Sequence, residues 1–314
     1  MRIGKCPENA YKRSVKKYLD TYRETHNTVK DQMITVVRQT ALDHEMAPAV
    51  FLQDGINAVC AQDAKAISTS IALALPPDTE EAYVSSVMKQ LAKTAKSQNV
   101  PLTEAAVSTF GGLSKAVLQI TVTAGRNKRQ EPVAGKELLL VHPIALAGTG
   151  ILAVEKKEQL LERFAQPFIC SAADHLEHLS VARAAELAFE HGAAYANALG
   201  EGGVFAGLWE LAEALSTGLS VDLKAIPIRQ ETVEICECFR LNPYLLLSTG
   251  ALLVVTENGK ELCRILCAQG MEAALIGTLQ AGNDRVLYND GETRYLDLPQ
   301  TDEIHRIMDR REQT

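Results

Sequence analysis

The chain of 314 residues is 46% hydrophobic and 23% charged, which is sufficient for two domains with separate cores. Its net charge of -7 argues against a protein that grips nucleic acid through a basic face, because phosphate contacts need clustered lysine and arginine. No apolar run is long enough to span a bilayer, and the N-terminal sequence lacks the apolar core of a secretion signal. We therefore expect a cytoplasmic protein with no nucleic-acid and no membrane partner.

The predicted elements of the first half alternate between helix and strand. Residues 7–24 predict a helix, residues 34–37 a short strand or the core of a helix, and residues 76–81 a helix start that combines a proline stop with early acids. In chain order, the remaining predictions are a small-residue apolar stretch over 47–74, a helix over 83–98, a strand over 118–122, a loop over 125–132 and a buried strand over 138–141.

The second half opens on a small-residue turn at 147–153 that enters a helix. The patterns that follow predict helices over 155–164, 172–176, 181–191, 203–214, 229–239 and 257–268, and strands over 219–223, 252–255, 273–279, 285–288 and 293–296. Mixed strands and helices in each half indicate an α+β or α/β fold.

A glycine-rich stretch, Gly200-Glu201-Gly202-Gly203, precedes an apolar helical pattern that includes Val204, Leu208 and Leu211. Its glycines let the backbone come close to a ligand or to another chain segment. The N–H groups of the first helical turn favour an anionic guest such as phosphate. The alternative is a plain connection between two elements.

Seven scattered cysteines indicate reduced thiols, for which burial as small hydrophobes is the default. Cys236-x-Cys238 and Cys263-x-x-x-Cys267 have no nearby residue that would complete a zinc site. His175-x-x-His178 has a spacing that can hold a metal, but that spacing is also common on exposed helices.

The second half resembles the C-terminal domain of the PurM superfamily, which includes aminoimidazole ribonucleotide (AIR) synthetase, selenophosphate synthetase, thiamine-monophosphate kinase and the hydrogenase maturation factor HypE. The similarity is strongest to HypE-like, AIR synthase-related proteins. The matching segments, in order, are residues 148–153, 180–185, 200–203, 221–228, 242–253 and 270–277. The resemblance implies an α+β, two-domain PurM-like fold: residues 1–136 form a shortened N-terminal domain whose mixed sheet dimerises, and residues 137–314 form a C-terminal α/β sandwich domain.

The first half resembles the family at residues 3–5, at Cys60-Ala61-Gln62-Asp63, where relatives have an Asn-Asp pair, and at Pro76-Pro77. Family members bind ATP and Mg2+ mainly through aspartates of this domain and pass the terminal phosphate to a carbonyl-type oxygen. Hard carboxylate oxygens suit Mg2+, and phosphoryl transfer depends on positioning and charge stabilisation. The resemblance thus implies ATP and Mg2+ as cofactors, Asp63 as the metal ligand, and a nucleotide- or ligand-binding set of Gln62, Asp63, Glu104, Gly200, Glu201, Gly202 and Gly203.

Several family features have no counterpart here. The span from residue 4 to residue 62 is too short for the family's glycine-rich ATP-binding segment, and Ala198 stands where relatives carry an aspartate. The chain ends on residues 311–314 without the terminal cysteine on which HypE carries its substrate.

Two hypotheses follow, and neither assigns a catalytic residue. In one, the protein is an ATP-dependent enzyme that transfers a phosphoryl group. In the other, it is a catalytically reduced relative, a pseudoenzyme that keeps the homodimeric scaffold and acts as a ligand-binding or maturation factor with a protein partner. The scarcity of carboxylates favours the second, because one carboxylate holds Mg-ATP weakly.

Overall fold

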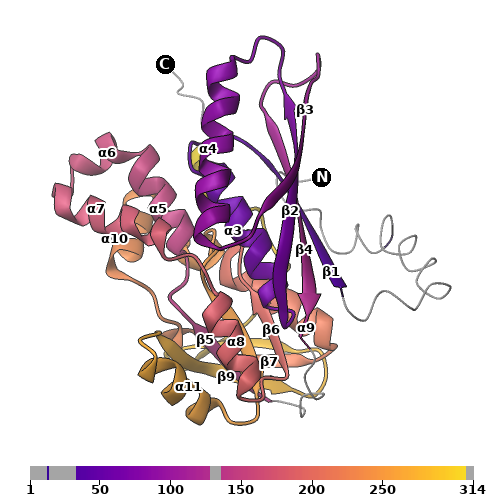
Figure 1. Cartoon of the computed structure of the whole chain (residues 1–314). Coiled ribbons are helices and arrows are strands. Elements are labelled where there is room, and N and C mark those ends of the chain that lie inside the picture. Colours follow the sequence, from indigo (N-terminus) through magenta and orange to yellow (C-terminus); the bar gives the residue numbers. More distant parts are fainter. Residues whose placement is uncertain (1–12, 14–32, 128–135, 309–314) are drawn as a thin grey trace.

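The computed structural model describes residue 13, residues 33–127 and residues 136–308. These form two mixed sheets with their helices (Figure 1). The helix predicted over residues 7–24 lies, apart from Arg13, outside the described residues, and so does most of the loop predicted over 125–132. Within the described residues no helix combines the length and the apolar character that crossing a bilayer requires.

The first sheet has the strand order β1-β4-β2-β3, in which only the β2–β3 pair is parallel. Two helices cover one of its faces (Figure 1). The elements are β1 (Met33–Ala41), α3 (Ala47–Cys60), β2 (Ala64–Leu75), α4 (Glu81–Ser97), β3 (Leu102–Thr109) and β4 (Val117–Arg126).

Sequence periodicity explains how α4 and β1 sit in this half. Val87, Leu91 and Ala95 recur every four residues and are the buried positions of α4, as the sequence predicts. Ile34 and Val36 of β1 alternate with exposed neighbours, so one side of the strand faces the helices and the other faces outward.

The second sheet has the order β11-β10-β7-β9-β5-β8-β6. Its strands are β5 (Glu137–Val141), β6 (Tyr195–Ala198), β7 (Gly218–Asp222), β8 (Leu252–Thr256), β9 (Ala273–Gln280), β10 (Arg285–Asn289) and β11 (Glu292–Tyr295). Its helices are α5 (Leu146–Glu155), α6 (Lys157–Leu161), α7 (Gln166–Asp174), α8 (Ala182–Glu190), α9 (Gly203–Leu215), α10 (Gln230–Phe239), α11 (Gly259–Ala268) and α12 (Glu303–Met308), with 3-10 turns η2 (His175–Glu177), η3 (Leu223–Ala225) and η4 (Pro243–Leu245).

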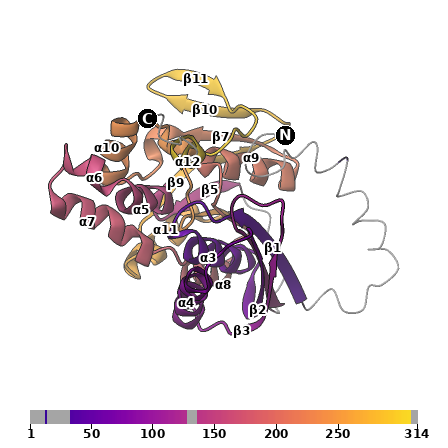
Figure 2. The same cartoon turned by 90° about the horizontal axis from the view of Figure 1, so that it is seen from above.

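Both faces of the central strands of this sheet are buried. Leu140 and Leu253 pack with α5 and α9, whereas Leu139 and Val254 pack with α8 and α11. The continuous apolar runs of β5 and β8 are therefore two-sided core strands. Figure 2 shows β10 and β11 at the edge of the molecule farthest from α3 and α4.

A buried polar network joins the two halves. The side chain of Asn57 on α3 donates to the carbonyl of Leu179 at 2.7 Å and accepts from the Val181 N–H at 3.1 Å. Gln53 also donates to Asn57 at 2.9 Å. Because each of these contacts satisfies a polar group that is out of water, the network fixes how α3 sits on the second half.

The predicted α+β class is confirmed, with two local corrections. The turn predicted at residues 147–153 is wrong: this segment lies inside α5, where Gly148 and Gly150 allow the side chains of Leu246 and Leu176 to approach the helix closely. The helix predicted over 155–164 is α6, limited to Lys157–Leu161. The two strands predicted over 285–288 and 293–296 are confirmed as β10 and β11.

Candidate ligand-binding cleft

A cavity of about 590 Å³ lies where the first sheet meets the glycine-rich loop of the second half. Its size is within the usual range for small-molecule sites. The lining residues are Val37, Arg38, Gln39, Thr40, Ala41, Asp43, Phe51, Asp54, Lys115 and Val117 from the first half, and Ala198, Gly200, Glu201, Gly207, Glu210, Leu247, Thr249 and His305 from the second. We call this cavity the cleft.

The glycine-rich loop packs against other chain segments as closely as backbone allows. Gly202 and Gly203 have φ of +83° and +66°, a region that favours glycine. A Cβ on Gly203 would lie 2.4 Å from the carbonyl oxygen of Tyr244, and one on Gly200 would lie 2.6 Å from Oδ1 of Asp54. The close approach of another chain segment, which the sequence predicts as one use of these glycines, is present.

The carboxyl group of Asp302 accepts backbone N–H groups just before the start of α9. The Gly202 N–H donates to Oδ2 at 2.6 Å, and the N–H groups of Leu247 and Ile304 donate to Oδ1 at 3.2 and 2.8 Å. Asp302 is wholly buried, and that burial raises the pKa of its carboxyl to about 7 even though the N–H groups oppose the shift. A carboxyl group of the protein itself thus accepts the N–H of Gly202, the residue that precedes α9.

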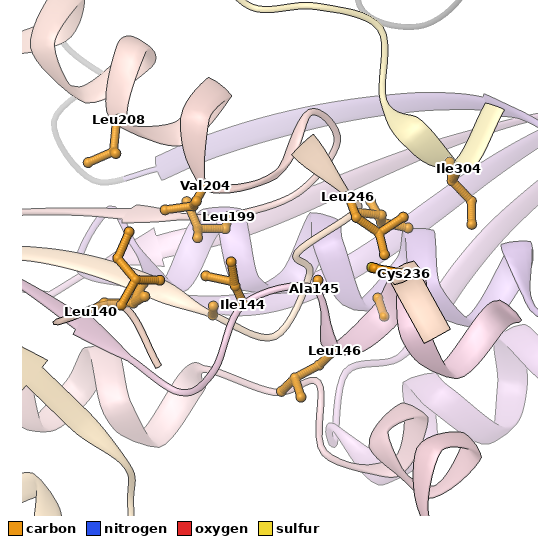
Figure 3. Close-up of a cluster of buried hydrophobic side chains, with 14 of the residues drawn as sticks. Leu140, Ile144, Ala145, Leu146, Leu199, Val204, Leu208, Cys236, Leu246 and Ile304 are labelled. Carbon is orange, nitrogen blue, oxygen red and sulfur yellow. The ribbon is translucent and has the colours of Figure 1, made fainter. Parts of the chain in front are cut away.

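The neighbouring residues of α12 complete this wall of the cleft. Nε2 of His305 lies 2.9 Å from Oε1 of Glu201, and this hydrogen bond raises the pKa of His305 above its ordinary value against the effect of burial. Figure 3 shows Ile304 in the same apolar cluster as Leu246 and Cys236. Apolar packing and polar contacts thus both attach α12 to the loops that line the cleft.

An ion pair lies in the first-half wall of the cleft. Nε of Arg38 on β1 lies 2.7 Å from Oδ2 of Asp54 on α3. Burial opposes the charge of Arg38, but Asp54, followed by Glu210 across the cleft, raises the pKa of the guanidinium. The cleft therefore has charged groups on both walls that act on one another.

Two polar groups at or near the cleft have no hydrogen-bond partner among the described residues. They are Oγ1 of Thr249, whose residue is fully buried and lines the cleft, and Nδ1 of His44. Burial lowers the pKa of His44 below its ordinary value. An unsatisfied buried hydroxyl costs about 1–3 kcal/mol, so the Thr249 side chain is destabilising where it stands.

The structure brings only part of the predicted binding set together. Gly200 and Glu201 line the cleft, and Gly202 and Gly203 lie directly behind them. Gln62 and Asp63 lie in the turn after α3, where Oδ1 of Asp63 accepts from the Asn127 side chain at 2.8 Å. Glu104 is an exposed residue of β3. Neither Gln62, Asp63 nor Glu104 lines the cleft, and their binding role stays a prediction.

The described residues do not fit a magnesium–triphosphate group in this cleft. Asp63 and Glu104 are not part of the wall that carries Glu201, and the Gly202 amide already donates to Asp302. In the parts of the chain that the structure describes, no three His, Cys, Asp or Glu residues are arranged to hold a metal ion, His175 and His178 included.

The described cysteines are free thiols in different environments, and the burial expected as the default is complete only for Cys236. Cys236 is buried, and burial raises its pKa to about 12, whereas Cys170 and Cys267 are exposed. Burial also raises the pKa of Cys60 and Cys263 to about 11. A thiol with a raised pKa is a poor nucleophile at neutral pH.

Sequence reasoning missed Asp302, His305, Arg38 and Thr249. For Asp302 the sequence did carry one indication, since an aspartate two residues before Ile304 is typical of a helix N-cap. The helix that it begins, Glu303–Met308, is too short to show a periodic pattern. Arg38 stands in a strand and pairs with a residue 16 positions away, which no local pattern reveals.

The family assignment rests on the second half. The family described as "AIR synthase related protein, C-terminal domain" matches residues 133–289, half of the chain. The chain belongs to the AIR synthase-related family. The second-half wall of the cleft, apart from His305, lies within the matched segment of this family member.

A curated relative extends the similarity into the first half. Carbamoyl dehydratase HypE of Rhodobacter capsulatus is 24% identical over 266 residues, which cover 80% of this chain and 76% of that protein. The similarity therefore spans both sheets of this AIR synthase-related protein.

Solved structures confirm the HypE-like, PurM-type fold. Escherichia coli HypE, described as a hydrogenase maturation protein, superposes with a TM-score of 0.73 at 18% identity and covers 88% of each chain. A hydrogenase maturation protein HypE in complex with ATP superposes with a TM-score of 0.71 at 17% identity and covers 91% of each chain. At these identities the likeness concerns the fold alone.

Proposed function

We propose that this AIR synthase-related protein is a HypE-like ligand-binding or assembly factor of a maturation pathway that works without phosphoryl transfer. The observation that carries the proposal is the Asp302 carboxylate on the Gly202 N–H. A phosphate would have to displace a buried carboxylate that accepts three N–H groups, which is unfavourable. The cleft of about 590 Å³ supports the ligand-binding part of the proposal.

The alternative is an ATP-dependent enzyme that passes a phosphoryl group to a carbonyl-type oxygen. It is favoured by the HypE structure in complex with ATP, which shares the fold. Under this alternative, Asp63, Glu104 and Glu201 would have to meet around Mg2+ with the Gly202 and Gly203 amides.

Titration calorimetry with Mg-ATP separates the two functions. We expect no heat of binding up to millimolar nucleotide. Binding in the micromolar range that Glu201→Ala or Asp63→Asn abolishes would establish the alternative instead. Glu158→Gln, an exposed change on α6, is the control for a general effect of charge.

We further propose a homodimer that pairs the open faces of two first sheets. Met33, Val37 and Ile67 are about half exposed, at 47%, 51% and 52%. Alternation in β1 puts Met33 and Val37 on the side of the sheet away from α3, and Ile67 packs over Gly125, which pairs with Met33. Burial of this apolar surface would drive association.

Sedimentation at micromolar concentration tests the dimer. Ile67→Lys should raise the dimer dissociation constant by about tenfold or more, because the new charge would be buried at the interface. Val107→Lys is the control: Val107 is similarly exposed at 47% but pairs in register with Leu73, whose side chain faces the helices. A wild-type monomer would contradict the proposal.

We also propose that the protein is cytoplasmic and has a protein partner in maturation.

A further inference from the structure

Three histidines from separate segments lie near the start of α10, outside the residues that line the cleft. His175 is in η2, His178 follows η2, and His142 follows β5. Arg229, the residue before α10, and His178 both act electrostatically on His142 and on His175. Within the ranges that the structure describes, the three histidines are not arranged to hold a metal ion. We call them the histidine cluster, and protons are the charges that it can take up.

The surrounding backbone fixes the position of His142. Its φ is +66°, a conformation that a bulky residue keeps only where its neighbours determine it. Its N–H donates to the carbonyl of Glu272 at 2.7 Å. Nδ1 of its ring lies 3.0 Å from the carbonyl oxygen of Gly250, and because a carbonyl only accepts, Nδ1 carries the proton. The charged form of His142 therefore arises by protonation of Nε2.

The ring of His175 is poorly prepared for a positive charge. Its Nδ1 is buried and has no hydrogen-bond partner among the described residues. In a neutral imidazole this nitrogen can be without a proton, whereas in the charged ring both nitrogens carry one. Protonation in the folded protein would therefore leave a buried N–H donor without an acceptor, which is unfavourable.

The charges around the two rings act in the same direction on balance. Burial is the largest cause, and it lowers the pKa of His142 and of His175 below the ordinary value. Arg229 and His178 add to this effect at both rings. The groups that oppose it are the Gly250 carbonyl and Glu272 at His142, and Glu231 and Asp174 at His175.

Gly250, which accepts from His142, packs directly on the backbone that follows η2. Its φ is +108°, and a Cβ on it would lie 3.2 Å from Cα of Leu179 and 3.7 Å from the carbonyl oxygen of His178. The position of the His142 ring and that of residues 178–179 are therefore linked through a single backbone contact.

Residues 178–181 also carry the contacts with the first half. Asn57 on α3 donates to the Leu179 carbonyl at 2.7 Å and accepts from the Val181 N–H at 3.1 Å. The Ser180 hydroxyl between them donates to the side chain of Gln98, directly after α4, at 2.8 Å. This short segment thus contacts the histidine cluster on one side and both helices of the first half on the other.

We propose that the histidine cluster is an acid-sensitive joint: protonation of His142 and His175 weakens the packing of residues 178–181 and loosens the contact between the two halves. In an open form both rings reach water and take up protons with an ordinary pKa of about 6.5. Acidification therefore favours the open form over the closed one. The joint concerns how the halves are held together and does not depend on the proposed ligand-binding function.

Hydrogen exchange of the Val181 N–H measures this opening, because that group donates to Asn57. Its protection factor, the exchange rate of an unstructured peptide divided by the observed rate at the same pH, is determined at about pH 7.5, 6.5 and 5.5. We expect the factor to fall at least about tenfold across this range. The amides of β8, which is buried at every residue, report global unfolding and should change less.

Substitutions then assign the effect to the two rings. His142→Asn removes the titratable group and keeps a residue type that tolerates a positive φ. His175→Gln removes the second ring. In the double variant the protection of Val181 should change less than about threefold over the same pH range, whatever its value at neutral pH. His191→Gln, an exposed change after α8, is the matched control and should keep the wild-type dependence.

Three outcomes overturn the proposal: wild-type protection of Val181 that stays constant with pH, an equal fall at β8, or a fall that the double variant retains in full. If the double variant does not fold, His175→Gln alone decides, because this site has no positive φ. That single variant should reduce the tenfold fall to about threefold, and a wild-type fall in its presence would also overturn the proposal.

Discussion

β8 in the second sheet is buried at every residue, whereas β1 in the first sheet alternates between buried and exposed positions. The difference follows from the layers: helices cover both faces of the central strands of the second sheet and one face of the first (Figure 1). A strand that is packed on both sides tolerates fewer residue types.

The cleft combines the two kinds of region. Its second-half wall is built on closely packed backbone around Gly203, and its first-half wall includes the exposed side of β1. We therefore expect substitutions in the second-half wall to affect stability and those on the open sheet face to affect association.

The largest expected effect is that of Gly203→Ala. The new Cβ would meet backbone atoms of Tyr244 and Leu245 at 2.4 and 2.9 Å, and φ is +66°. Backbone cannot move aside as a side chain does, so we expect the free energy of unfolding to fall by more than about 4 kcal/mol in urea denaturation. Gly192→Ala has the same sign of φ, +82°, but nothing within 4 Å, and should cost only about 1 kcal/mol. Equal costs would mean that the close approach is unimportant.

The next largest effect is expected from truncating a core side chain, and its cost in stability should differ between the two sheets. Leu253 on β8 is 0% exposed, so Leu253→Ala should lower the free energy of unfolding by about 3 kcal/mol. Val107 on β3 is 47% exposed, and Val107→Ala should cost less than about 0.5 kcal/mol. Urea midpoints followed by circular dichroism provide both values. A cost at Val107 as large as that at Leu253 would show that β3 is packed against a partner.

The last expected effect is a dependence of stability on pH. The pKa of Asp302 is raised to about 7 in the folded protein, so the folded state binds more protons than the unfolded state between about pH 4 and 7. The free energy of unfolding should therefore fall as pH rises through that window, with a slope of at most about 1.4 kcal/mol per pH unit.

Asp302→Asn isolates this contribution. The raised pKa of His305 acts in the same direction near neutral pH, while the lowered pKa of His44 acts in the opposite one. Subtracting the Asp302→Asn profile from that of the wild type removes most of what the other groups contribute. Urea denaturation at pH 5, 6, 7 and 8 measures both profiles, and parallel profiles would mean that Asp302 is ionised across the range.

The fold could be predicted where periodicity extends over several turns or alternations. α4 shows Val87, Leu91 and Ala95 at regular spacing, and β5 and β8 are continuous apolar runs. β3 was not predicted, because its exposed edge gives no alternation, and β6 is only four residues long. Short and exposed elements form where the rest of the structure places them.

The candidate site could be predicted only as far as its local part. The glycine-rich loop and Glu201 follow from residue types within four positions. Asp302 and His305 contact this loop although they lie 100 and 104 positions away in the sequence. Arg38 on β1 contacts Asp54 on α3, 16 positions away. Such pairs depend on topology, so one sequence alone does not reveal them.

The contact between Gly202 and Asp302 also bears on how the protein is made. During translation the glycine-rich loop leaves the ribosome 100 residues before the carboxylate that accepts its N–H. At ribosomal speeds of about 5–20 residues per second, the loop is without that carboxylate for at least several seconds, and water takes its place. The native contacts of the glycine-rich loop are therefore complete only after α12 has been synthesised.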